Sequence, residues 1–302
     1  GGGDSGKVAG QNGYAGVPNT GGGGGGGANN PQGTGGNGGS GIVIVRYPVN
    51  SYSVNQTVVQ GDPYFANVVM SLHADTSPCV DSSQLNATIT TASTGGAGTA
   101  AAQSTAQYKF GAGSILISPN GSTAYTTSST SITYCLPNDY TVEFWIYFTT
   151  IPNSGVGRFV AVGTGSASPV VLFWYIASTN RAWFVGDISS SSANPFTTNT
   201  WYHLAGCRQG TTQYFFINGV LQGTITQATA DASPTTPKAV FIGAGGTNGA
   251  ITGLNESGTF YIDDLRVTKG VARYTSNFVV PQFAFPDNFG TQINEYPPAA
   301  LT

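Results

Sequence analysis

Few residues in this sequence are of the types that carry out acid–base or nucleophilic chemistry. The two histidines, His73 and His203, lie far apart along the chain, and no Gly-x-Ser-x-Gly motif marks an activated serine. Cleavage of a glycosidic bond needs two paired carboxylates. The three glutamates, Glu143, Glu256 and Glu295, form no such cluster. We therefore expect a protein that is not an enzyme.

Three aspartates are the candidate ligands for a metal ion. Asp75 lies in a polar loop, and Asp263 and Asp264 are neighbours on an expected strand. Because Ca²⁺ prefers carboxylate oxygens, a calcium site is one interpretation of these residues. The alternative is structural, with each carboxylate accepting hydrogen bonds from main-chain amides or pairing with a nearby cation. Adjacent residues of a strand point to opposite faces, so we do not expect Asp263 and Asp264 to share one pocket.

Aromatic side chains on expected strands are the candidates for contact with a ligand. Trp145 and Tyr147 alternate with an apolar stripe, which assigns them to the less buried or concave face of a sheet. Trp174 and Trp183 lie on two further expected strands. Aromatic rings exposed on such a face can stack on sugar rings, whereas most tryptophans bury the greater part of their area. Ligand contact and core packing both remain open for the four residues.

Short strands separated by turns must position these residues. Residues 140–148 alternate between apolar side chains and a second, mixed face, as a half-buried strand does. Asn218-Gly219, between Ile217 and Val220, predicts a type I′ hairpin turn. No segment shows a sustained helical period. Many strands with turn residues between them predict an all-β fold, an antiparallel two-sheet sandwich of the jelly-roll type.

The first 41 residues differ in composition from the rest of the chain. Twenty of them are glycine, including the unbroken run Gly21–Gly27, and they lack the Gly-X-Y period of collagen. One interpretation is a flexible linker. The other is a packed bundle of polyproline-II-like glycine helices, which we prefer. The β-branched run at 42–45 predicts a short strand.

Composition divides the chain into four expected parts. They are a glycine-rich assembly segment with a short strand at 1–47, a connector at 48–66, the jelly roll at 67–287 and an extended tail or linker at 288–302. Charged residues are only 8% of the 302 residues, and the net charge is −3. So few cations argue against binding to nucleic acid. No run of about 18 apolar residues is present, so we expect no insertion into a membrane.

Five motifs, taken in order, resemble the laminin-G-like family of the concanavalin A-like lectin/glucanase jelly rolls. They are YTVEFWIYF from Tyr140, TWYHLA from Thr200, YFFINGV from Tyr214, VFIG from Val240 and FYIDDLRV from Phe260. The last motif continues as TKGVARYTSNF, which is especially similar to sequences in tailed-phage tail fibres and other virion proteins. The glycine-rich block also resembles phage fibre and adhesin sequences.

The resemblance implies a two-sheet sandwich that binds glycans or proteins in many members and holds a structural calcium in several. We therefore expect an extracellular virion appendage protein that combines fibre assembly with multivalent binding to a host-surface glycan or receptor. Its partners would be copies of itself, usually three in phage fibres, and other virion proteins. The alternative is a purely structural subunit of an extracellular filament or capsid decoration, with no ligand.

Overall fold

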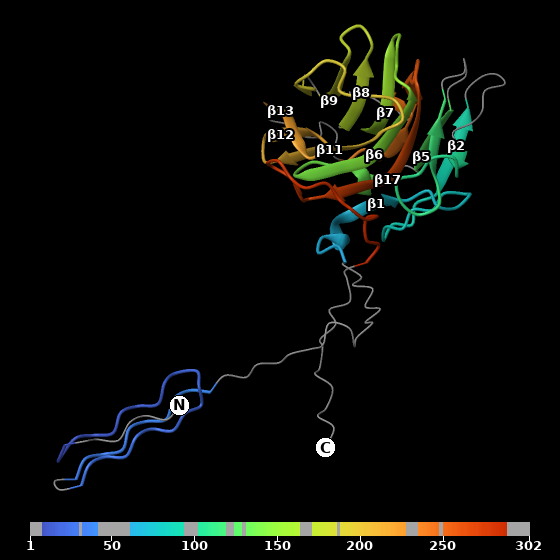
Figure 1. The fold of residues 1–302 in the computed structure, drawn as a ribbon. Helices are drawn as coiled ribbons and strands as arrows, with labels where there is room; N and C mark the ends of the chain where they lie inside the picture. The colour runs from blue at the N-terminus through green and yellow to red at the C-terminus, as the bar shows by residue number, and fades with distance from the viewer. Residues whose placement is uncertain are drawn as a thin grey trace. The chain divides into compact units, whose positions relative to one another are not determined.

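Figure 1 shows the fold of the chain in a computed structural model. The chain divides into two compact units, Gly1–Val58 and Val59–Thr302, which we describe separately. The expected domain boundaries stay predictions, and the expected strand at 42–45 lies outside the described residues. The structure describes residues 8–29, 32–41, 61–93, 102–118, 124–128, 131–163, 171–185, 188–227, 235–247 and 250–288.

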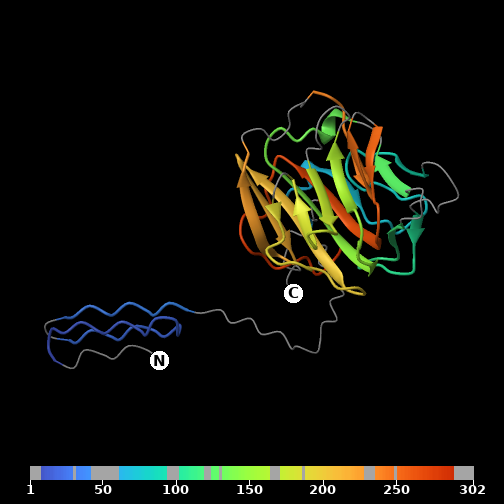
Figure 2. The ribbon, with the colours of Figure 1, turned by 90° about the horizontal axis from the view of Figure 1, so that it is seen from above.

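In the first unit, three glycine-rich segments run side by side, the first around residues 11–16, the second around 22–28 and the third around 33–40 (Figure 2). Main-chain hydrogen bonds of 2.7–3.0 Å join each segment to the other two. The donors within a segment are three residues apart, which is the period of a polyproline II helix. Hydrogen bonds between the main chains of neighbouring segments are what a packed bundle of glycine helices requires. The donors are Gly13 and Gly16 toward the third segment, Gly36 and Gly39 toward the second, and Gly25 and Ala28 toward the first.

Glycine at the bonded positions lets the main chains approach one another. A Cβ atom added to Gly36 would collide with the carbonyl oxygen of Tyr14. By contrast, a Cβ atom on Gly38 would come no closer than 3.6 Å to another segment, at the oxygen of Gly22. The close packing therefore depends on particular glycines of the segment and not on all of them.

The second unit is a sandwich of two antiparallel sheets, which confirms the predicted fold class. Sheet A contains, in spatial order, β13 (Val220–Thr226), β12 (Thr212–Ile217), β11 (Trp201–Gln209), β6 (Tyr140–Thr150), β17 (Thr259–Lys269), β4 (Ser114–Ile117) and β3 (Ala102–Ser104), with β1 (Val68–Leu72) also paired to β17. Sheet B contains β10 (Ile188–Ser189), β9 (Arg181–Phe184), β8 (Val171–Ile176), β7 (Val156–Gly163), β14 (Ala239–Ile242), β5 (Ala124–Ser128) and β2 (Ile89–Ser93). The described residues also form a hairpin of β15 (Ala244–Thr247) and β16 (Ala250–Leu254), and two short 3₁₀ turns, η1 (Phe65–Asn67) and η2 (Ile132–Tyr134).

The hydrophobic core lies between the two sheets. The alternation predicted for 140–148 is confirmed on β6, where every second side chain from Val142 to Phe148 is buried in this core. Phe144 meets Phe173 of β8 edge to face, with ring centroids 5.0 Å apart. Burying a side chain of this size stabilises the fold by roughly 1.5–3 kcal/mol. The intervening residues of both strands point outward, where the candidate sites lie.

The predicted hairpin turn is also confirmed. β12 ends at Ile217 and β13 begins at Val220, and the φ angles of Asn218 and Gly219 are 49° and 73°. Asparagine and glycine adopt such positive φ angles readily, as a type I′ turn requires. The carbonyl oxygen of Gly219 accepts a hydrogen bond of 2.9 Å from the amide of Phe278. The turn therefore anchors a segment that follows the last strand.

Candidate functional site

That segment, residues 271–288, covers part of the outer face of sheet A, and we call it the C-terminal strap. The rings of Tyr274 and Phe278 stack on each other at 3.6 Å. Both rings pack edge to face against Phe216, which belongs with Cys207 to a small hydrophobic cluster outside the main core. The strap thereby closes this region of sheet A to ligands.

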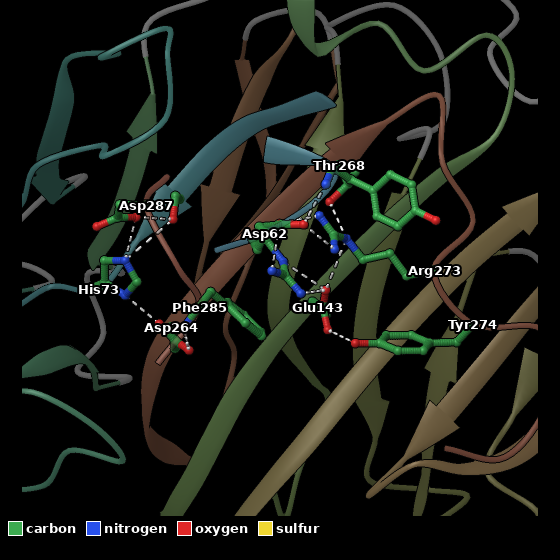
Figure 3. Close-up of polar contacts among 12 residues, drawn as sticks. Asp62, His73, Glu143, Asp264, Thr268, Arg273, Tyr274, Phe285 and Asp287 are labelled. Atoms are coloured by element: carbon green, nitrogen blue, oxygen red, sulfur yellow. Dashed lines mark hydrogen bonds and ion pairs between the residues drawn. The ribbon is translucent and has the colours of Figure 1, made fainter. Parts of the chain in front are cut away.

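Beneath the strap, two carboxylates bind two arginines (Figure 3). Glu143 Oε1 accepts hydrogen bonds from Nη2 and Nε of Arg266, at 2.6 and 3.0 Å. Asp62 Oδ2 accepts from Arg266 Nη1 at 3.0 Å and from Arg273 Nη2 at 2.6 Å. The hydroxyl of Tyr274 donates to Glu143 Oε2 at 2.9 Å. The charges in this buried cluster balance, which reduces the cost of removing them from water.

The pKa of Glu143 lies far below its ordinary range. Complete burial alone would raise this pKa, but the neighbouring Arg266, His203 and Arg273 lower it by more. The group is therefore ionised, and its oxygens are occupied by these partners. A carboxylate in this state cannot act as a general acid, and its hydrogen bond from Tyr274 attaches the strap to β6.

Trp145, one of the predicted ligand contacts, is buried on the outer side of sheet A. The edge of Phe110 packs against its ring at 5.9 Å, and Lys109 Nζ lies 4.2 Å from the ring centroid. His203 of β11 stands directly opposite Trp145, and the centroids of the two rings are 5.1 Å apart. Only 3% of Trp145 is exposed. Of the two roles left open by the sequence, this environment fits packing, because the ring has no free face for a sugar.

Tyr147, two residues further along β6, is only half-buried. Its hydroxyl donates to Asn199 Oδ1 at 3.2 Å. Its ring lies 5.4 Å from Trp201 and 6.1 Å from Tyr261. Neither neighbour was predicted as a ligand contact from the sequence, although Trp201 is the second residue of the TWYHLA motif and pairs directly with Tyr147. The three rings form a small aromatic cluster on sheet A.

His73 joins the residues after β1 to β17 and to the strap (Figure 3). Its Nδ1 contacts Asp264 Oδ1, and its Nε2 lies 2.9 Å from Asp287 Oδ1. Burial by itself lowers the pKa of His73, but hydrogen bonds to the two carboxylates raise it to about 10. The imidazole is therefore protonated at neutral pH.

Ser71 lies beside this histidine, so that a serine, a histidine and an aspartate meet. Its hydroxyl oxygen is 3.5 Å from His73 Nε2, but it donates to Asp287 Oδ1 at 3.0 Å. Ser71 is also fully buried. A nucleophile must be reachable, and its base must be free to accept a proton. Neither condition is met. The hydrogen bonds among Ser71, His73, Asp264 and Asp287 instead attach the strap to β17 and to the residues after β1, and we call this group the latch.

A bulge in β17 corrects the expectation that Asp263 and Asp264 point to opposite faces. Pairing with β6 shifts between Asp263 and Arg266, and Asp264 has a φ of 51°. The extra residue interrupts the alternation of the strand. Asp264 accepts a hydrogen bond of 2.9 Å from the amide of Phe285, in the strap. The bulge thus lets both carboxylates bind segments that connect to the outer side of sheet A.

The other two predicted metal ligands bind main-chain amides. Asp263 Oδ2 accepts from Lys109 at 2.6 Å and from Phe110 at 3.1 Å. Burial raises the pKa of Asp263 to about 7, against the opposing effect of these amides. Asp75 Oδ1 accepts from Ala112 at 2.5 Å and from Gly113 at 3.2 Å. Hydrogen bonds from main-chain amides are the contacts expected if these aspartates have a structural role.

No metal centre is formed by the residues that the structure describes. Among them, no three His, Cys, Asp or Glu side chains are grouped so that they could hold an ion. Asp75, Asp263 and Asp264 use oxygens on amides or on His73, so they do not fit a shared calcium site. Calcium remains an expectation that rests on the family resemblance alone.

A different aromatic site lies on the outer face of sheet B. Trp174 of β8 stands directly opposite Trp183 of β9, and the two indoles are nearly parallel, at 15°, with centroids 6.3 Å apart. Arg158 of β7 stands opposite Trp174, and Ser189 of β10 opposite Trp183. Directly opposed residues share a face, so these four half-buried side chains cross four strands in one line. We call them the aromatic row.

Hydrogen bonds hold two members of the aromatic row. Arg158 Nη1 donates to Glu256 Oε1 at 2.9 Å. Trp183 Nε1 donates to Thr179 Oγ1 at 3.4 Å. The structure therefore brings together two predicted residues, Trp174 and Trp183, and separates them from Trp145 and Tyr147 on sheet A. Arg158 and Ser189 were not predicted, because only the register of the strands places them beside the indoles.

The fold and its motifs agree with a known superfamily. A profile of the concanavalin A-like lectin/glucanases superfamily, in its Laminin_G_3 form, matches residues 120–273, just over half of the chain. The chain belongs to this superfamily. The matched region includes both aromatic sites and the expected strands from 140 onward, so the lectin-like domain is the part of the chain that carries them.

Similar solved structures come from the botulinum neurotoxins. The binding domain of botulinum neurotoxin DC, in complex with rat synaptotagmin II, is 14% identical, has a TM-score of 0.52, and aligns over 69% of this chain and 49% of that one. The serotype C1 binding domain is 14% identical, with a TM-score of 0.49 over 69% and 50% of the two chains. The chain thus spans about half the length of these proteins. At this identity the likeness shows the fold alone.

No curated protein sequence matches the chain. In the part of the chain that the structure describes, no helix is long and apolar enough to cross a membrane.

Proposed function

We propose that the lectin-like domain is a non-enzymatic module that binds a glycan or receptor on a cell surface through the aromatic row. The observation that carries this proposal is the pair of nearly parallel indoles, Trp174 and Trp183, in register on neighbouring strands. Rigid strands hold both rings, so little conformational freedom is lost when a ligand binds. Half-buried indoles keep apolar surface available for the face of a sugar ring.

The comparisons support a binding role. The superfamily to which the chain belongs is named for lectins and glucanases. The similar neurotoxin structure is that of a binding domain in complex with a protein, rat synaptotagmin II. Both carbohydrate and protein ligands are therefore compatible with this type of sandwich, and the indole pair favours the carbohydrate.

The carboxylates support the non-enzymatic part of the proposal. Glycosidases need one carboxyl group that gives up a proton and a second that is free to act on the sugar or on water. Glu143 is buried and ionised between arginines, and Glu256 is paired with Arg158. Neither carboxylate has the environment that such a reaction requires.

We further propose that the protein is an extracellular, tail-fibre-like virion appendage. In this role the glycine-rich unit assembles with other copies, three in the usual phage arrangement, and with other virion proteins. The period-three hydrogen bonds of the first unit support an assembly role, because they use main-chain groups and hardly any charge. Linking several weak sites raises the effective concentration of each to about the millimolar range, so weak binding by one domain suffices.

Glycan-array binding by the full chain tests the proposal. Wild type is compared with Trp183→Ala, which removes one indole of the aromatic row, and with Trp201→Ala, which removes an indole of the cluster on sheet A. We expect saturable binding by wild type, an affinity at least about tenfold lower for Trp183→Ala, equivalent to about 1.4 kcal/mol, and little change for Trp201→Ala. Failure of the folded wild type to bind any glycan or host cell would favour the alternative, a purely structural filament or decoration subunit.

A further inference from the structure

Arg181 stands next to the aromatic row. It is separated from Trp183 by one residue of β9, so both side chains lie on the outer face of sheet B, roughly 7 Å apart along the strand. It is half-buried, and it stands opposite Ile176 of β8. Arg181 Nη1 donates to the main-chain oxygen of Ser190, which follows β10. This bond directs the guanidinium toward the end of the row where Ser189 lies.

The charge environment of Arg181 differs from that of three other arginines on this unit. Arg158 is balanced by Glu256, and Arg266 and Arg273 are balanced by Asp62 and Glu143. Within the ranges that the structure describes, Arg181 forms no ion pair. The chain as a whole has a net charge of −3. A cation without a described counterion therefore lies beside aromatic surface on a slightly acidic protein.

We infer that the ligand of the aromatic row is an anionic sugar, and that Arg181 binds its acidic group. This inference rests on the proposed function. A guanidinium matches the planar geometry of a carboxylate and can also bind a sulfate through two parallel hydrogen bonds. With the sugar ring on Trp183, an acidic substituent that projects toward β10 would reach the donors that Ser190 leaves free. A neutral sugar of the same shape would stack equally well but leave the cation uncompensated.

The test compares matched acidic and neutral sugars. The probes are a uronic acid oligosaccharide, its carboxyl-reduced neutral counterpart of the same length, and a sulfated oligosaccharide. Binding of each to the full chain is measured by titration calorimetry at low and at high salt. We expect the wild type to bind one of the two acidic probes about tenfold more tightly than the neutral one at low salt. The advantage should shrink at high salt, because ions screen exposed charges. The acidic probe that is preferred identifies the group as carboxylate or sulfate.

Three variants locate the effect. Arg181→Gln should abolish the preference for the acidic probe and leave affinity for the neutral probe unchanged. Trp183→Ala should weaken binding of all probes. Lys109→Gln is the matched control, because it removes a cation that lies over an aromatic ring on sheet A, and it should change nothing. An unchanged unfolding midpoint shows that each variant is folded.

The outcomes separate the two proposals. Equal affinity of the wild type for acidic and neutral probes, or an unchanged preference in folded Arg181→Gln, would overturn the role of Arg181 while leaving sugar binding intact. No binding of any probe, by a folded wild type, would overturn the binding function itself and this inference with it.

Discussion

The carboxylate of Glu143 should contribute far more to stability than that of Glu256. Glu143→Gln leaves Arg266 and Arg273 with only part of their counter-charge in a buried site, so we expect a loss of about 3–5 kcal/mol in the free energy of unfolding. Glu256 is 49% exposed at its side chain, and Glu256→Gln should cost less than about 1 kcal/mol. Chemical denaturation measures both. If both variants lost a similar amount of free energy of unfolding, the buried ion cluster would not be what holds the strap.

The latch at His73 should make stability depend on pH. The pKa of His73 in the folded protein, about 10, exceeds the ordinary value of 6.5. Folding therefore favours the protonated form, and the resulting stability is fully present below about pH 6.5 and is lost as the pH rises toward 10. We expect wild type to exceed His73→Gln in free energy of unfolding by a larger margin near pH 6 than near pH 10. A margin independent of pH would show that protonated His73 does not hold the strap.

At the scale of elements, the glycine bundle should tolerate alanine at some positions only. A side chain at Gly36 would collide with Tyr14, whereas one at Gly38 finds room. Amide hydrogen exchange of the first unit reports on its main-chain bonds. Gly36→Ala should lose protection at these amides, and Gly38→Ala should keep nearly all of it. Equal protection in both variants would contradict the packed arrangement.

Some elements could be predicted from the sequence because their signals are local. The alternation along β6 and the Asn218-Gly219 turn need only neighbouring residues, and both are present in the structure. The burial of Trp145 could not be predicted in this way. The same alternation places Trp145 and Tyr147 on one face. Trp145 is nevertheless covered by Phe110 and Lys109, which lie more than thirty residues earlier in the chain.

The candidate site was predictable only in part, because its arrangement depends on contacts between residues far apart in the sequence. Trp174 and Trp183 stand out by residue type, but their alignment with Arg158 and Ser189 depends on the register of four strands. Register is a long-range property when strands pair through loops of variable length. The bulge at Asp264 is similar, because nothing in the adjacent pair of aspartates marks an extra residue.

At the scale of the molecule, the outer faces of the two sheets of the lectin-like unit differ in how far they are covered. The strap and a buried ion cluster close much of sheet A, and they use several of the chain's few charges. On sheet B, two half-buried indoles lie beside Arg181. This division supports the view that sheet A serves the stability of the unit and that sheet B serves its interactions.

The most direct test of this view follows the four tryptophans separately. Each indole N–H gives its own signal in a ¹⁵N-correlated NMR spectrum of the full chain, and single Trp→Phe variants assign the signals. During titration with the glycan found on the array, we expect the signals of Trp174 and Trp183 to shift together and saturate, while those of Trp145 and Trp201 stay in place. Saturable shifts at Trp201 with none at Trp174 and Trp183 would show that the ligand binds sheet A and not the aromatic row.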